Sequence, residues 1–334
     1  MTVAAPGAVD ALTLRDRLAV YLSLRRGLGY RLDKLELLAG QFCDWLTAQG
    51  KATFTTADAV TWARLPEHAD PAWWGMRLGA VRTFAAWLHA TGTDVQVPPR
   101  GLLPARSRRA VPFIYTPSEL DALLRVCPSV FTHPLIGHTM TTLIGLLAAT
   151  GMRVGEALAL TPNDLQAPAI DTGNGLGVVV IRHSKNGTSR LVPVHATTYR
   201  RLVAYRDLPG RVRAVIDPGG PLLVTTRGAG YHRSTIECYY SRVAAAAGLS
   251  PRGRARPRLH DLRHTFATRH MVAAYQSGTD PQRTLTLLTT WLGHTSTAHT
   301  YWYLSATPQL LSLAAQRLDV PDTDTREPKD GYPS

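Results

Sequence analysis

Apolar residues three and four positions apart recur along most of the 334-residue chain, and this spacing predicts helices. Two such patterns fill residues 12–50, and a third begins at Thr55. A fourth opens at Asp70-Pro71, carries an apolar stripe from Trp74 to Leu88, and stops at Gly92. Together they predict a small bundle of about four helices.

The pattern changes after residue 115. Thr116-Pro117-Ser118-Glu119 is typical of a helix start, because Thr and Glu three apart can cap each other's backbone amides. Apolar runs at 176–181 and 190–194 predict two strands, with a turn between them. Helical patterns then resume and end with 308–318. The predicted fold class is mainly α with a small β-sheet.

A basic, proline-rich stretch separates the two halves. We expect a helical domain over 1–104, a linker over 105–115, a mixed domain over 116–320 and a disordered tail over 321–334. The linker holds three arginines without apolar neighbours, and an extended basic linker can lie along a phosphate backbone. These linker arginines are Arg106, Arg108 and Arg109.

The formal net charge is +13, and arginine supplies almost all of the positive charge, since lysine occurs only at positions 34, 51, 185 and 329. Arginine favours bidentate contact with phosphate, which points to nucleic acid. The alternative is the background composition of a GC-rich genome. On the helical domain the predicted DNA-facing arginines, which a merely solvated surface would also explain, are Arg25, Arg26, Arg77 and Arg82.

The three cysteines, Cys43, Cys127 and Cys238, are far apart and fit neither a disulfide framework nor a zinc spacing. We find no signal-peptide pattern and no apolar run long enough to span a membrane. These features predict a cytoplasmic protein of the bacterial nucleoid, with no membrane partner.

Candidate chemistry gathers in four short stretches. Thr150-Gly151-Met152-Arg153-Val154-Gly155-Glu156 supplies one arginine, and residues 259–268, LHDLRHTFAT, supply His260 and Arg263. Leu259, Leu262 and Phe266 predict a helix with one apolar face, so His260 and Arg263 would share another face, one turn apart. A guanidinium beside an imidazole suits a site that holds an anion and moves a proton. The last two stretches are Leu292-Gly293-His294 and Tyr301-Trp302-Tyr303.

Each candidate also has a plainer interpretation. Arg153 could be a surface arginine paired with Glu156, and Lys185, at the predicted turn, could be solvated. His260 could pack in a core, cap a helix, or share a metal with His264. The intervening Asp-Leu-Arg lacks a zincin glutamate and places a cation beside any metal, so we expect neither metal nor other cofactor.

Taken together, these four motifs, in this order, resemble those of the tyrosine recombinase (phage integrase) family. The tyrosine at position 303 follows His294 by nine residues, which matches the family spacing. The resemblance covers roughly 112–318 and implies a core-binding (SAM-like) helical domain and a mixed α/β catalytic domain. The aromatic run around Tyr303 is similar to that of recombinases carried by transposons and integrative elements.

The resemblance implies that Tyr303 attacks a DNA phosphodiester to give a 3′-phosphotyrosine intermediate, with Tyr301 as the weaker candidate. Arg153 and Arg263 would stabilise the charged phosphorus, and Lys185 would protonate the leaving 5′ oxygen. His260 would handle a proton or bind phosphate, and His294 would hydrogen-bond a phosphate oxygen. Glu156 would support Arg153 or its helix.

The expected partner is double-stranded DNA with an inverted-repeat site, bound by a dimer and synapsed by a tetramer, with further recombinases as possible partners. The resemblance also implies that the final helix, 308–318, docks in a neighbouring protomer. The predicted activity is site-specific recombination, including integration or transposition of a mobile element. Two alternatives stay open: a DNA-binding regulator or architectural protein without cleavage, and a type IB topoisomerase.

Overall fold

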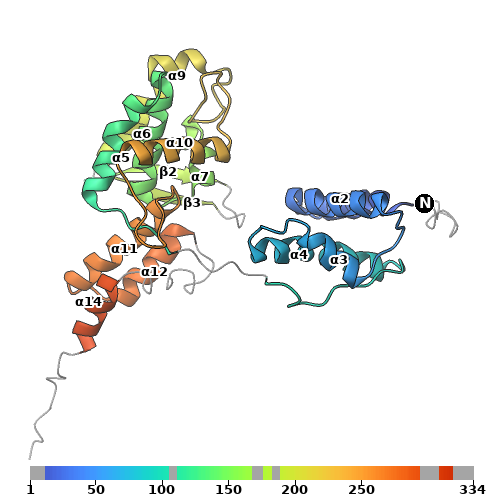
Figure 1. Ribbon diagram of the computed structural model, residues 1–334. Helices are drawn as coiled ribbons and strands as arrows, with labels where there is room; N and C mark the ends of the chain where they lie inside the picture. Colours follow the sequence, from blue (N-terminus) through green and yellow to red (C-terminus); the bar gives the residue numbers. More distant parts are fainter. Residues whose placement is uncertain (1–11, 105–110, 168–175, 183–188, 294–307, 319–334) are drawn as a thin grey trace, which may run out of the picture. The chain divides into compact units, whose positions relative to one another are not determined.

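The computed structural model describes residues 12–104, 111–167, 176–182, 189–293 and 308–318 (Figure 1). The chain divides into two compact units, 1–109 and 110–334. The division falls within the stretch expected to be the linker. Within the described residues, no helix has both the length and the apolar character needed to cross a bilayer.

The N-terminal unit is a helical bundle. Its helices begin where the sequence supplies caps: the Thr13 and Thr55 side chains accept from backbone amides three residues on, and Asp70 caps the helix that starts with Pro71. Phe42 lies at the centre of its core, with ring centroids 4.9 Å from Phe54 and 5.2 Å from Trp62. The helices are α1 (Leu14–Gly27), α2 (Asp33–Ala48), α3 (Thr56–Arg64) and α4 (Pro71–Ala90).

The C-terminal unit is mostly helical, with one small antiparallel sheet in the order β1-β2-β3. Val179 of β2 pairs with Leu165 of β1 and with Val192 of β3. The described elements are α5 (Pro117–Val130), α6 (Pro134–Thr150), α7 (Val154–Leu158), η1 (Pro162–Asp164), β1 (Leu165–Gln166), β2 (Gly177–Ile181), β3 (Arg190–Val194), α8 (Ala196–Arg206), α9 (Pro209–Ala214), α10 (Arg233–Ala246), α11 (Asp261–Gln276), α12 (Pro281–Leu292) and α14 (Pro308–Leu318).

The mainly helical fold with a small sheet, predicted from the sequence, is confirmed. The single apolar face expected for α11 is wrong, because every residue from Asp261 to Thr268 is buried. The helix packs against α6 and also against α12 and α14, so its first turns are enclosed on several sides (Figure 1). This enclosure means that the polar side chains of its first turns, including Arg263, must find partners inside the protein.

Candidate active site

Arg153 is held at a sharp junction between two helices. Helix α6 ends at Gly151, whose φ of 62° is left-handed. A Cβ atom at Gly151 would lie 2.6 Å from Phe266 Cδ1, so the position needs glycine for space as well as for φ. Arg153 then caps α7, and about a quarter of its side chain remains exposed. The junction therefore fixes the backbone of Arg153 and leaves part of its guanidinium accessible.

Arg263 lies almost fully buried between the carboxyl ends of two helices. Its Nη1 donates to Gly151 O at the end of α6 (2.8 Å), and its Nη2 donates to Leu292 O at the end of α12 (2.7 Å). The carbonyls at a helix C-terminus carry partial negative charge, which stabilises a cation there. A guanidinium can span two such carbonyls, whereas a lysine ammonium presents only one point of charge.

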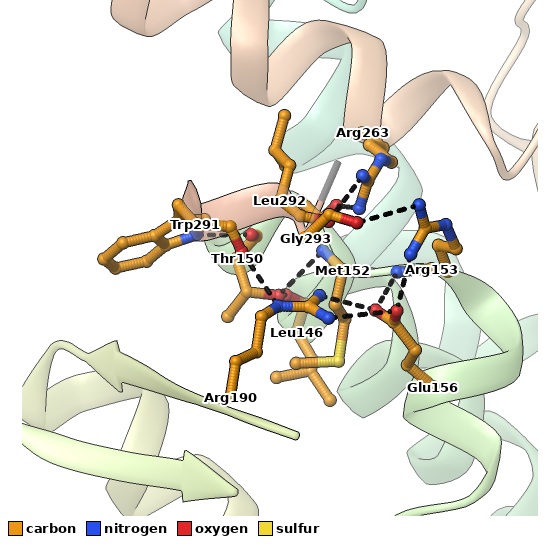
Figure 2. A network of polar contacts seen from close by, with 11 residues as sticks. Leu146, Thr150, Met152, Arg153, Glu156, Arg190, Arg263, Trp291, Leu292 and Gly293 are labelled. Carbon is orange, nitrogen blue, oxygen red and sulfur yellow. Dashed lines mark hydrogen bonds and ion pairs between the residues drawn. The ribbon is translucent and has the colours of Figure 1, made fainter. Parts of the chain in front are cut away.

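Glu156, a buried carboxylate, joins two arginines (Figure 2). Its Oε1 accepts from Arg153 Nη1 (2.9 Å) and Arg190 Nη1 (3.1 Å). Its Oε2 accepts from the Arg153 backbone amide (2.9 Å) and Arg190 Nη2 (2.7 Å). Burial alone would raise the pKa of Glu156, but the hydrogen bonds and charges of the two arginines outweigh it and leave that pKa below its usual value.

Three arginines from separate elements converge on the end of α12, where three consecutive carbonyls each accept a hydrogen bond (Figure 2). Arg190 Nε donates to Trp291 O (2.9 Å), Arg263 Nη2 to Leu292 O (2.7 Å), and Arg153 Nη2 to Gly293 O (3.4 Å). Trp291 also donates from its indole to Thr150 O (2.8 Å), which ties α12 to the end of α6. The structure thus brings together Arg153 and Arg263, which lie 110 positions apart in the sequence.

His260 stands at the N-cap of α11, one residue before the helix, and its side chain reaches solvent. The surrounding protein displaces water from the imidazole, and the nearby charges of Arg263, Arg258, Arg233 and Arg153 add to this effect; together they lower the pKa of His260 to about 4. At neutral pH the ring is therefore uncharged, able to donate from one nitrogen and accept at the other. Its centroid lies 5.3 Å from that of His264.

Asp261 fixes the start of α11 beside His260. Its buried carboxylate accepts from Arg258 Nε (3.0 Å) and Nη2 (2.7 Å). Burial raises the pKa of Asp261 even though Arg258 pulls it down. The amide of Tyr115, the last residue of the expected linker stretch, donates to Thr265 Oγ1 of the same helix (3.0 Å). The helix that carries Arg263 is therefore fastened directly to the first residues of the C-terminal unit.

Several predicted residues lie outside the described part of the chain. These are Lys185, His294 and Tyr303, the competing Tyr301, and the linker arginines Arg106, Arg108 and Arg109. By sequence, His294 directly follows Gly293, and the described strands β2 and β3 flank the stretch that holds Lys185.

The arginines of the N-terminal unit differ from expectation at one position. The prediction that Arg77 is exposed for DNA is wrong: its side chain is buried, donates to Trp62 O (2.9 Å) and lies 3.7 Å from the Trp62 ring centroid. Aromatic stacking and a carbonyl partner draw this guanidinium into the core. Arg26 is exposed and paired with Glu36.

The other two predicted DNA-facing arginines of this unit are half-buried. Arg25 lies over the Tyr30 ring, 3.8 Å from its centroid. Arg82 donates to Pro98 O (2.7 Å) and Pro99 O (2.9 Å), carbonyls that lie a few residues before the expected linker. Both guanidiniums therefore already have partners in the protein, and DNA contact by Arg25, Arg26 and Arg82 stays a prediction.

Arg190 and the arginines that precede His260 were not among the predicted site residues. Arg190 shares a strand face with the buried Val192 and Val194, and a charged residue on a buried strand face needs a partner. The placement of an arginine on the same strand face as two valines was therefore a signal, present in the sequence, that Arg190 has a partner inside the protein. Arg254 and Arg256 are exposed in the loop before α11, where arginine occupies every second position from 252 to 258. This local concentration of charge was visible in the sequence.

The sequence is similar to those of known proteins. The model of the phage integrase family matches residues 114–309. A Sinorhizobium fredii protein named as an integrase/recombinase, y4rB, is 36% identical over 92% of this chain and 97% of its own length. The tyrosine recombinase XerC of Rhizobium meliloti is 29% identical over 69% of this chain and 65% of its own length.

Solved structures share the fold. The XerH site-specific recombinase, in a post-cleavage complex with palindromic difH substrate, superposes with a TM-score of 0.62 at 17% identity, covering 92% of this chain and 85% of that one. The Tn1549 transposon integrase, in complex with a circular intermediate DNA, gives a TM-score of 0.59 at 18% identity over 92% and 100% of the two chains. From the match of the family model and the y4rB relative, this chain belongs to the phage integrase family of tyrosine recombinases.

Proposed function

We propose that this chain is a site-specific DNA recombinase that cuts and rejoins strands through a 3′-phosphotyrosine intermediate. The observation that carries the proposal is the convergence of Arg153 and Arg263 on neighbouring carbonyls at the end of α12. Family membership supplies the reaction class. The arrangement gives two fixed cations, one of which stays partly exposed, at the point where the chain continues into the segment that holds His294 and Tyr303.

In the proposed cleavage step, the Tyr303 oxygen attacks the scissile phosphorus while its phenol proton passes to a base, a role that we assign to the neutral His260 imidazole. The bond from phosphorus to the 5′ oxygen breaks. The released 5′ oxygen takes a proton from Lys185. Arg153 and Arg263 stabilise the additional negative charge on the pentacovalent phosphorus. Resealing reverses the step, when a 5′ hydroxyl attacks the phosphotyrosine. The new linkage is close in energy to the one broken, so strand exchange needs no high-energy cofactor.

The neutral His260 fits a role as a hydrogen-bonding partner of the phosphate. A scissile phosphate brought among Arg153, Arg263 and His260 would offset the arginine charges that lower the pKa of His260. DNA binding would therefore raise this pKa and bring the imidazole closer to a proton-transfer role near neutral pH.

Double-stranded DNA is the proposed partner. The net charge of +13 supports it, as do relatives whose structures are described as DNA complexes. We further propose that two copies bind one inverted-repeat site and that two sites synapse, as in the solved structures described as a lambda integrase dimer on a core site and a tetramer on a Holliday junction. The transposon integrase among the structural relatives fits a role in a mobile element.

Covalent capture tests the proposal. Purified full-length protein is incubated with sheared genomic DNA of the organism that carries the gene, denatured with detergent, and recovered with any DNA still attached. The expected result is a DNA population whose 3′ ends map to a small number of inverted-repeat sites. Protein that retains DNA in native buffer but none after denaturation would favour a non-cleaving DNA-binding protein.

A further inference from the structure

Arg190 opens β3 and is mostly buried, with 13% of its side chain exposed. It contacts Glu156 through both terminal nitrogens and the end of α12 through Nε (Figure 2). Among the described residues, its hydrogen-bond acceptors are Glu156, which also holds Arg153, and the Trp291 carbonyl at the end of α12. Because Nε, Nη1 and Nη2 of Arg190 all donate to these partners, we expect its effect on the reaction to pass through a neighbouring residue.

The hydrogen bonds at Glu156 are shared in a specific way. Each carboxylate oxygen accepts one bond from Arg190 and one from Arg153. Arg190 binds both oxygens with its guanidinium fork, at 3.1 and 2.7 Å. Arg153 uses only Nη1 of its guanidinium and completes the pairing with its backbone amide. Its Nη2 donates instead toward Gly293 O, away from the carboxylate.

This sharing matters because guanidinium and carboxylate prefer a two-pronged pair. If Arg190 were absent, the buried charge of Glu156 would be balanced by Arg153 alone. The Arg153 side chain would then form a more stable pair by donating from both terminal nitrogens to the carboxylate. In that arrangement the partly exposed part of its guanidinium would no longer be available to bind a phosphate. Because Arg190 occupies one side of each carboxylate oxygen, Glu156 accepts only one hydrogen bond from the Arg153 side chain.

The hydrogen bond from Arg190 to the end of α12 also helps to position Arg153. Arg190 Nε donates to Trp291 O, one peptide before the carbonyl that accepts from Arg263 and two before the one that accepts from Arg153. Gly293 has φ 65°, and a Cβ atom there would lie 2.8 Å from Arg190 Nη1. Arg190 therefore packs against the turn toward which Arg153 points, and it fixes that turn relative to Glu156.

From this geometry we infer that Arg190 is a positioning residue for phosphate binding by Arg153, acting through the shared Glu156 carboxylate. The inference rests on the proposed function, because its readout is DNA cleavage. A site recovered by covalent capture is built into a duplex with a nick beside the cleavage position, so that the short released strand diffuses away and the adduct accumulates. Single-turnover adduct formation is then measured with protein in excess.

The test is a double-mutant cycle with four full-length proteins: wild type, Arg190→Gln, Arg153→Lys and the combination. We expect Arg190→Gln to slow cleavage by roughly 10- to 100-fold, the range for a misplaced catalytic group. Affinity for a 30-base-pair duplex of random sequence should change by less than about 3-fold, because few phosphate contacts are altered. In the Arg153→Lys background, Arg190→Gln should add less than about a 3-fold loss, since its effect passes through Arg153.

Arg182 provides the matched control, as a second arginine bonded to a buried carboxylate at the base of the same strand pair, with Nε 2.6 Å from Asp164 Oδ1. The fold-losses in cleavage rate caused by Arg182→Gln and Arg153→Lys should multiply in the double variant. Thermal melting of each variant verifies that it is folded at the assay temperature.

Three results would count against the inference or its premise, and they are distinguishable. If wild type forms no adduct, the proposed function fails. If wild type cleaves and Arg190→Gln stays within about 3-fold of it, Arg190 does not position Arg153. If the losses from Arg190→Gln and Arg153→Lys multiply, Arg190 supports the fold without acting through Arg153.

Discussion

Replacing Glu156 with glutamine removes one negative charge from between two guanidiniums while keeping the side-chain shape. The carboxylate accepts four hydrogen bonds from Arg153 and Arg190. The amide oxygen of glutamine can keep the bonds at one position. At the other position an NH₂ group would face two donors, so about half of the bonds are lost and a donor clash replaces them.

The loss of stability follows from these contacts. A hydrogen bond to a charged group contributes roughly 1.5 to 3 kcal/mol. Two such losses agree with the roughly 3 to 5 kcal/mol observed when one partner of a buried ion pair is removed. Glu156 is buried, so solvent offers little compensation. We therefore expect Glu156→Gln to lower the free energy of unfolding of the C-terminal unit by about 4 kcal/mol, a fall in Tm of roughly 8 to 16 °C.

Hydrogen exchange of peptides from α7 and β3, measured in increasing urea, reports on this unit separately from the N-terminal one. Asp164→Asn is the matched control. Asp164 is also buried, but its partner Arg182 is largely exposed and the Thr161 bonds can persist, so the loss should be about 1 to 2 kcal/mol. A loss below about 1 kcal/mol for Glu156→Gln would refute the argument that this carboxylate holds the two arginines together.

The pH dependence of Glu156→Gln has a defined sign. The folded-state pKa of Glu156 lies below its usual value of 4.5, so its contribution is fully present above that pH. It is lost as pH falls through the lowered pKa, because the unfolded chain then binds the proton more readily. Wild type should therefore lose stability between about pH 5 and the folded pKa, and Glu156→Gln should lose less over the same range. Equal slopes would contradict the lowered pKa.

Three further predictions concern other parts of the molecule. Gly151→Ala should lower the free energy of unfolding by about 2 to 4 kcal/mol, because the left-handed φ and the contact with Phe266 both oppose a Cβ. Gly155→Ala, with open space around it, should change the free energy of unfolding by no more than about 1 kcal/mol. Urea unfolding compares the two variants, and equal losses would refute the packing argument. NMR titration of His260 should give a pKa of about 4 in the free protein and a higher one with duplex DNA bound. A free-protein pKa above 6 would show that desolvation and the arginine charges do not lower the pKa of this ring. Arg77→Met should destabilise the N-terminal unit by about 1 to 3 kcal/mol. The salt dependence of its DNA affinity, measured by filter binding, should match that of wild type. A weaker dependence of DNA affinity on salt in the variant would show that Arg77 contacts DNA.

Local signals predicted most of the helices, because they depend on neighbouring residues. The capping residues at Thr55, Asp70 and Thr116 mark the starts of α3, α4 and α5, as the structure shows. Strand β1 and helix α9 were missed because elements of 2 and 6 residues are too short to show a period. The starts of α3, α4 and α5 thus followed from the sequence, because a capping residue marks each one.

The site was only partly predictable. The motifs indicated Arg153 and Arg263, but not that both donate to carbonyls at the end of α12. Arg153 lies 140 positions before its acceptor Gly293, and no local pattern reports a contact over that distance. The sequence also did not show that Arg190, 34 positions after Glu156 and on a strand, shares this carboxylate with Arg153. Arg77 was misassigned because an arginine on a helix looks exposed until an aromatic partner from another helix is known. Tertiary packing decides each of these three cases, and the sequence pattern does not contain it.

The most direct measurement of the central claim is the identity of the residue that carries DNA after cleavage. Captured adduct is digested with nuclease and protease, and the phosphorylated peptide is sequenced by mass spectrometry. We predict that the modification lies on Tyr303 and that Tyr303→Phe forms no adduct. Modification of Tyr301, or an adduct that persists in Tyr303→Phe, would contradict the assignment, and the absence of any tyrosine-linked nucleotide would contradict the proposed reaction itself.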